Sequence, residues 1–295
     1  MKSLFAAFCL LCLSLPCVAA DEGHPLSMWR VSGASNDIYL LGSIHMLRES
    51  DYPLPSVMYD AYRDAETLVM EIDMDDMDPF EDQAIAAELG LINDGRTLRD
   101  LLGASNYSKA ESMAAELNIP LMLLDQSEPW FAAITVEVMM LMRIGFNPMH
   151  GIESHFADMA VRDSKEILGF ETTRQQLEFL DNLSPATQRD MLLQTLADSM
   201  KISEMMDQMI DAWYFGKVDF LEQNLLSEMQ KFRELHDTIV VRRNRNWVER
   251  INAMLREKDD YLIVVGALHL IGDQGVPKLL AARGHKVTQL HQPAN

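Results

Sequence analysis

The sequence predicts an α/β fold in which helices cover a largely parallel central sheet. Two observations support this class. Short apolar segments rich in β-branched residues alternate along the chain with longer segments of helical periodicity. A block without strand signals, at about residues 172–257, then precedes the last strands. We interpret this block as a helical insertion that caps the α/β fold.

The strand pattern occurs in six short segments, most of them bounded by turn or polar residues. Parallel strands buried on both faces have this nearly continuous apolar character. The segments are residues 38–42, 67–72, 121–124, 166–171, 261–266 and 285–290.

Helical periodicity fills the intervals between these strands, and the predicted helices include residues 53–65, 105–117, 128–144 and 152–163. In the strand-free block, Ser184 and Pro185 together with Gln188 predict the cap and first turn of a helix. The Asp-rich segment 73–82 lacks the central glycine and the terminal glutamate of a calcium loop. We therefore expect a solvated loop that leads into a helix.

The first twenty residues have the order of a secretory signal peptide. Lys2 supplies a positive charge, residues 4–15 are apolar, Pro16 follows, and small residues end at Ala20. The apolar run is shorter than the roughly 20 residues that span a bilayer, so no stable transmembrane anchor is expected. The sequence predicts cleavage after Ala20, a periplasmic or secreted location, and a single domain over residues 21–295 with a helical cap.

Cysteine content and charge restrict the classes of partner. All 3 cysteines lie in the predicted signal peptide, so the mature chain has neither disulfides nor thiol chemistry. The net charge of −20 argues against nucleic acid as a partner and favours cationic ligands and metal ions. Phosphate-loop and Gly-x-Ser-x-Gly patterns do not occur, which disfavours nucleotide cofactors and serine hydrolysis.

One local pattern occurs twice: an apolar strand followed by Gly-x-x-His. It begins at Gly42 and ends at His45 near the start of the chain, and it runs from Gly266 to His269 near the end. Ligands bind outside the carboxyl ends of strands in open α/β sheets, where glycine permits sharp turns and close approach. We therefore expect both histidines at one edge of the sheet.

Two further predicted strands end in a carboxylate, Glu71 and Glu171. If all four strands are parallel, two imidazoles and two carboxylates converge on one rim. This donor set suits a divalent ion such as Zn, Mn or Co, and a remaining carboxylate could act as a general base. Metal-assisted hydrolysis is the chemistry that these residues favour.

Two other groups of side chains have simpler interpretations. His150 and His155 are five residues apart, which places them on different helix faces and argues against a zinc helix. The methionines at 139–142 and 205–209 have the spacing of buried helical faces. We expect core packing from the methionines, with an adaptable methionine-lined substrate groove in the helical block as the alternative, and helix-start or surface roles from the histidines.

The order of motifs along nearly the whole mature chain resembles the TraB/GumN family. This family is related to the Tiki metalloproteases and more distantly to erythromycin-esterase and ChaN-like proteins. The residues that carry the resemblance are Trp29-Arg30-Val31, Tyr39 to His45, Pro53, Glu71-Ile72-Asp73, Gly151-Ile152-Glu153 with Phe156, Phe170-Glu171-Thr172 with Gln175-Gln176-Leu177, Arg243-Asn244 with Trp247, and Val265 to Leu270 with Gly272.

The resemblance implies a metal-dependent peptidase-like site at the two Gly-x-x-His motifs. It implies that His45 and His269 are metal ligands and that Glu71 is a ligand or the general base. Further residues of the implied pocket are Glu171 as a metal ligand, Arg243 and Asn244 as catalytic groups, and Glu153 and Gln175 as substrate-binding groups.

Two functions of different classes follow from the sequence. The first is an exported metal-dependent hydrolase that takes a peptide or protein substrate. The second is a non-enzymatic exported binding protein that holds haem or a peptide at the same rim, since exposed histidines can ligate haem iron.

Overall fold

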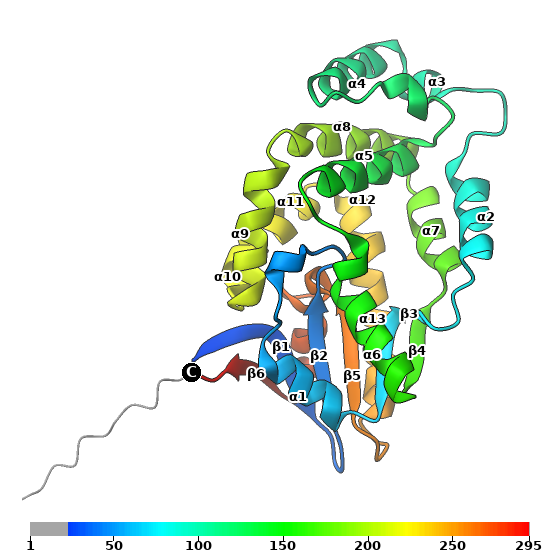
Figure 1. The fold of residues 1–295 in the computed structure, drawn as a ribbon. Coiled ribbons are helices and arrows are strands. Elements are labelled where there is room, and N and C mark those ends of the chain that lie inside the picture. Colours follow the sequence, from blue (N-terminus) through cyan, green and yellow to red (C-terminus); the bar gives the residue numbers. More distant parts are fainter. Residues whose placement is uncertain (1–22, 295) are drawn as a thin grey trace, which may run out of the picture.

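The fold is described by a computed structural model that covers residues 23–294 (Figure 1). The predicted signal peptide, its cleavage position after Ala20 and the three cysteines lie outside the described residues. The chain forms one six-stranded sheet with the strand order β4-β3-β5-β2-β1-β6. Its strands are β1 His24–Ser32, β2 Asp37–Ser43, β3 Thr67–Ile72, β4 Glu166–Glu171, β5 Tyr261–Gly266 and β6 Lys286–Gln292.

Helices fill most of the chain between the strands. The α-helices before β5 are α1 Ser56–Asp64, α2 Pro79–Gly90, α3 Leu98–Leu102, α4 Ala104–Glu116, α5 Pro129–Arg143, α6 Ile152–Asp163, α7 Thr173–Asp181, α8 Pro185–Ser199, α9 Ile202–Tyr214, α10 Val218–Leu221, α11 Ser227–Gln230, α12 Arg233–His236 and α13 Arg242–Met254; α14 Val276–Ala282 follows β5. The shorter helical segments are η1 Glu49–Asp51, η2 Leu121–Leu124, η3 Pro148–His150, η4 Glu222–Leu226, η5 Asp237–Val241 and η6 Ala267–Leu270.

Four neighbouring strands of the sheet are parallel, which confirms the predicted α/β class. β2 pairs with β5, β5 with β3, and β3 with β4, all in parallel register. β1 and β6 add an antiparallel edge beside β2. The strands that carry the two Gly-x-x-His motifs and the two glutamates are therefore contiguous, and their carboxyl ends share one edge.

Alternate residues of each strand enter two separate apolar clusters, one on each face of the sheet. Leu41, Met70 and Val264 pack with residues of α1 and α6 on one face. The other cluster contains Leu40 and Ile263, together with residues of α13 and α14. Figure 1 shows α1 and α6 in front of the strands and α13 behind them. Both faces are covered, as expected for a parallel sheet.

The predicted helical block corresponds to α7 through α13, and no strand occurs within it. Ser184 caps α8 by accepting a hydrogen bond from the backbone N–H of Thr187, and Pro185 is the first helical residue, as the sequence predicts. A third apolar cluster joins α8 to α3, α4 and α5, above the sheet in Figure 1. The helix α8 of the insertion therefore lies over the edge at which the parallel strands end, whereas α13 covers one face of the sheet.

Two strand predictions differ from the structure. Residues 121–124 form the helical segment η2, because Leu121 and Leu124 are buried while the two residues between them are exposed. That three-residue spacing suits a tight helical turn, and a short apolar run does not distinguish it from a strand. The strand β1 is missing from the prediction; it begins at the polar His24, and a register shift after Pro25 interrupts its pairing with β6.

The described part of the chain, residues 23–294, contains no helix that combines the length and the apolar character needed to cross a bilayer.

Candidate functional site

The two Gly-x-x-His motifs lie side by side at the carboxyl edge of the sheet. Gly42 pairs with Val265, and the next residue of β2, Ser43, pairs with Gly266 at the end of β5. His269 follows in η6, and His45 follows in the loop after β2. The parallel register therefore brings the repeated motif to one place, as the sequence predicts.

Three candidate side chains meet around Gly266. A Cβ atom added at Gly266 would lie 3.3 Å from Glu71 Oε1, 3.6 Å from His269 Cδ2 and 3.8 Å from His45 Cε1. The backbone at this position has a φ of −50°. Conformation alone therefore does not require glycine here. The absence of a side chain at Gly266 instead leaves open the small space that the two imidazoles and the carboxylate share.

Glu71 is buried and carries a negative charge. Its Oε1 accepts the Gly266 N–H at 2.8 Å, and its Oε2 accepts from Arg243 at 2.5 Å and from Gln176 at 3.0 Å. Burial alone would raise the pKa of Glu71, but the charges of His269, Arg243 and His45 and the Gly266 N–H lower this pKa to about 2.

His269 is a buried, neutral imidazole with a fixed tautomer. Burial lowers its pKa to about 3, against the opposing effect of Glu71. Asn244 donates its Nδ2 hydrogens to the backbone oxygens of His269 and Gln274, so its Oδ1 must accept from His269 Nδ1 at 2.6 Å. The lone pair is then on Nε2, which lies 3.2 Å from Arg243 Nη1 and 3.8 Å from Glu71 Oε1.

His45 is held by a carboxylate from α6. Its Nδ1 donates to Glu153 Oε1 at 2.6 Å, and the hydroxyl of Ser43 donates to the same oxygen at 2.5 Å. The charge of Glu153 raises the pKa of His45, whose side chain is 71% exposed. Burial would raise the pKa of Glu153, but His45 and Ser43 lower it. A Cβ at Gly151 would overlap the His45 carbonyl oxygen, so glycine allows α6 to approach this closely.

Arg243 connects the two predicted carboxylates. Its Nε and Nη2 donate to Glu171 at 2.7–3.0 Å, Nη2 also donates to Glu71, and Nη1 contacts His269 and the backbone oxygen of Ile239. All five N–H donors of the guanidinium are therefore engaged within the protein. Glu171 also accepts from the indole N–H of Trp247 at 3.0 Å. Glu171 is therefore the partner of Arg243, and Arg243 lies between Glu171 and the imidazole of His269.

The two glutamines at the start of α7 have different positions. Gln175 forms a capping box with Thr172, in which each side chain bonds the other's backbone N–H. Gln176 instead donates from Nε2 to both Glu71 and Glu171. The sequence prediction places Gln175 in the substrate site and does not include Gln176. The Thr172-x-x-Gln175 spacing is itself the sequence signature of a capping box, and it could have separated the two.

The donor chemistry of the rim fits a divalent cation. The lone pair of His269 Nε2 and the ionised Glu71 border the space at Gly266, and the Nδ1 atom of each histidine is held by an acceptor, an arrangement typical of metal-binding histidines. Glu153 Oε2 is buried without a hydrogen-bond partner among the described residues. Within residues 23–294, no three His, Cys, Asp or Glu side chains already stand close enough to hold an ion. The ligand types are therefore present at this rim, and His45 is the most exposed of them.

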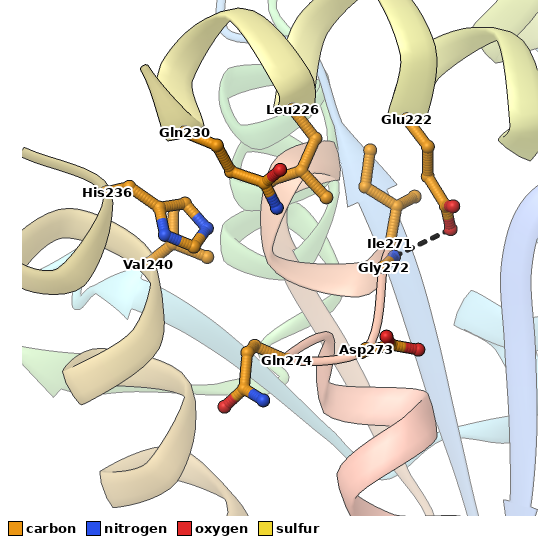
Figure 2. Close-up of a pocket in the computed structure, with 9 residues that line it drawn as sticks. All are labelled: Glu222, Leu226, Gln230, His236, Val240, Ile271, Gly272, Asp273 and Gln274. Carbon is orange, nitrogen blue, oxygen red and sulfur yellow. Dashed lines mark hydrogen bonds between the residues drawn. The ribbon is translucent and has the colours of Figure 1, made fainter. Parts of the chain in front are cut away.

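Two cavities lie near these residues. The first, of about 240 Å³, is bordered by His45, Glu71 and Glu153, and most of its remaining wall is apolar. The second, of about 200 Å³, lies behind the loop that follows His269 and is more polar. Figure 2 shows this second cavity, where Glu222 accepts the Gly272 N–H at 2.8 Å. Its wall contains none of the predicted site residues, so the first cavity is the candidate site.

Comparison with known proteins gives a family and two relatives. The model described as the TraB/PrgY/gumN family matches residues 27–289. The uncharacterised protein YbaP of Escherichia coli (strain K12) is 23% identical over 244 residues, which cover 82% of this chain and 87% of the relative. The YbaP protein of Shigella flexneri has the same identity and coverage. No solved structure matches the chain.

Proposed function

Because the chain belongs to the TraB/PrgY/gumN family, we propose that it is an exported, metal-dependent hydrolase that acts on peptides. The single observation that carries the proposal is the meeting of His45, Glu71 and His269 around Gly266 at the carboxyl edge of the parallel strands. Ligand and reaction sites of open α/β sheets lie at this edge.

The residues have separate roles in this proposal. His45, His269 and Glu71 would hold a divalent ion such as Zn, Mn or Co. When bound, such an ion would polarise the substrate carbonyl and acidify water. The low pKa of Glu71 makes this carboxylate a weak base, which favours the ligand role over the general-base role.

Two further residues orient the proposed ligands or balance their charge and do not contact the substrate. Asn244 keeps the proton of His269 on Nδ1, so that Nε2 retains its lone pair. Arg243 balances the charges of Glu71 and Glu171, and its donors are all engaged. Both are positioning residues, and the Nη1–H of Arg243 that contacts His269 Nε2 would be released when that nitrogen binds an ion.

The proposed activity is tested on a proteome-derived peptide library with the mature chain after incubation with Zn, Mn or Co. We expect new peptide termini with the native protein, and a loss of about 10²-fold or more in Glu71→Gln and His269→Ala. Glu88→Gln is the matched control, since Glu88 pairs with Arg174 on the surface. Cleavage by no metal form, or equal cleavage by Glu71→Gln, would contradict the proposal.

Export is part of the same proposal and is tested separately. When the full chain is expressed in a bacterium, we expect the protein outside the cytoplasm with Asp21 as its first residue. A cytoplasmic protein that retains Lys2 would contradict this part and leave the proposed chemistry untouched.

A further inference from the structure

We infer that the cavity beside Glu71 is a specificity pocket for one large, flexible apolar side chain of the substrate, of the leucine, methionine and phenylalanine class. This inference rests on the proposed function, because the pocket is bordered by the groups proposed to act on the substrate. It goes further by naming the kind of residue that lies next to the bond to be cleaved.

The part of the wall beside the reactive groups is apolar. It is formed by Met70 and Ile72 of β3, by Met74 and Met77 of the loop that follows, and by Pro148 of η3. Met70 is fixed in the core, and Met74 packs partly against the same cluster. Met70 and Met74 therefore form a well-packed part of the pocket wall, and this part continues directly into the strand that carries Glu71.

Met77 supplies the adjustable part of the wall. Its side chain is 40% exposed, and it is an apolar residue in a loop whose neighbouring residues, Asp75, Asp76 and Asp78, are acidic. Asp78 caps α2 by accepting from two backbone N–H groups, which holds the end of the loop. A thioether on an unbranched chain adapts to differently shaped apolar partners. An exposed methionine that borders a cavity beside the reactive groups is thus placed to contact a ligand.

The size of the cavity suits a single side chain. An apolar cavity of about 150 Å³ holds benzene. The cavity of about 240 Å³ beside Glu71 therefore has room for one large apolar side chain.

Charge excludes acidic side chains from the pocket. Its charged border consists of Glu71, Glu153 and His45, and His45 is already bonded to Glu153. The neighbouring cation, Arg243, is already bonded to Glu71 and Glu171. Among the described residues, no Lys or Arg lines this cavity. An aspartate or glutamate side chain would therefore lie beside two carboxylates, and the cations next to them, His45 and Arg243, are already paired.

The inference is tested by NMR on the mature protein carrying ¹³C-methyl methionine, without added metal. Met74 and Met77 are assigned from Met74→Leu and Met77→Leu. We expect N-acetyl-leucine amide and N-acetyl-methionine amide to shift both methyl resonances saturably, with affinity at least about 10-fold higher than that of N-acetyl-aspartate amide. Met122 is the internal control, because its side chain is 73% exposed on η2, and η2 contributes no residue to the pocket. Equal response to the aspartate derivative, or no response, would overturn the inference.

A second measurement separates this inference from the proposed function. We expect Met77→Glu to weaken binding of the leucine amide about 10-fold, while Met122→Glu leaves it unchanged. Binding that follows this pattern in a protein that cleaves no peptide would support the pocket and contradict the hydrolase. Cleavage of library peptides without enrichment of Leu, Met or Phe beside the cleaved bond would overturn the pocket and support the hydrolase.

Discussion

At the scale of single residues, the site depends on a buried cation. Arg243 is 5% exposed and lies between Glu71 and Glu171. The sequence predicted that both glutamates reach the rim, because each ends a parallel strand. It did not show which of them borders the imidazoles, because that depends on where α13 places Arg243 and on the bonds from Gln176. These contacts join residues far apart in the chain.

Removing this cation should destabilise the fold strongly. Arg243→Gln leaves two buried carboxylates without their partner, so we expect the free energy of unfolding to fall by about 3–5 kcal/mol. Arg242→Gln is the matched control, since Arg242 is the preceding residue and its side chain is 69% exposed. We expect a change within about 0.5 kcal/mol for the control. Urea unfolding measures both, and equal losses would contradict the buried ion-pair network.

A side chain at Gly266 should weaken metal binding without lowering the stability of the fold. The Gly266 backbone accepts alanine, but a Cβ there would lie 3.3 Å from Glu71 Oε1 and would occupy the space that Glu71 shares with His269 and His45. We expect Gly266→Ala to fold with near-native stability and to lose metal binding at least about 10-fold. Gly103→Ala should instead lose stability and keep metal binding, because Gly103 has a φ of 75° and open space around it. The strain costs about 1–3 kcal/mol and leaves binding unchanged. Thermal unfolding and metal titration distinguish the two; unaltered metal binding in Gly266→Ala would argue against a shared site there.

At the scale of elements, regular apolar segments were predictable and irregular ones were not. The four strands that bear the site, β2 to β5, and the helices α1, α4, α5 and α6 match the predicted segments closely. Short or interrupted segments were not resolved by periodicity: η2 has a strand-like composition, and β1 has a register shift. The pattern also did not reveal that β6 pairs antiparallel with β1, because strand direction depends on the path of the connections.

The start of α7 offers a test in two adjacent residues. We expect Gln175→Ala to cost about 1 kcal/mol of stability, because it removes half of the capping box, and to leave the site unchanged. Gln176→Ala should instead alter the site, since it removes the donor shared by Glu71 and Glu171. Urea unfolding and metal affinity, measured on both variants, check the assignment. The reverse pattern would show that the two side chains exchange places.

The contact between α6 and the loop after β2 should depend on pH through His155. Its ring lies 5.2 Å from that of Tyr52 and 5.7 Å from that of Tyr59, and Nε2 is buried without a partner among the described residues. Burial lowers the pKa of His155, with a further lowering by Arg162 and an opposing effect of Asp158. Below the unfolded value of about 6.5, the unfolded chain therefore binds more protons than the folded one at this residue.

It follows that His155 makes the native protein lose stability as the pH falls below about 6.5. Urea unfolding between pH 7.5 and 5 should show a steeper loss for the native protein than for His155→Gln. His291→Gln, at an exposed position of β6, should keep the native slope. Parallel curves for the native protein and His155→Gln would refute a lowered pKa at His155.

At the scale of the whole molecule, the parallel sheet collects motifs that are more than two hundred residues apart. Gly42 and Gly266 become neighbours because β2 and β5 share a register, and α8 of the helical block between them lies over the same edge. The repeated Gly-x-x-His pattern is sufficient to predict this edge from the sequence. The apolar cavity was not predictable, because it combines β3, the Asp-rich loop and η3, none of which has a binding motif of its own.

The central claim is that His45, Glu71 and His269 form one metal site, and elemental mass spectrometry tests it most directly. The mature chain from Asp21 is incubated with Zn, Mn or Co, desalted, and compared with His45→Ala/His269→Ala and with His291→Ala as the surface control. We expect about one equivalent of one metal in the native protein and in His291→Ala, and loss of that metal in the double variant. Equal metal content in all three proteins, or none in the native protein, would contradict it.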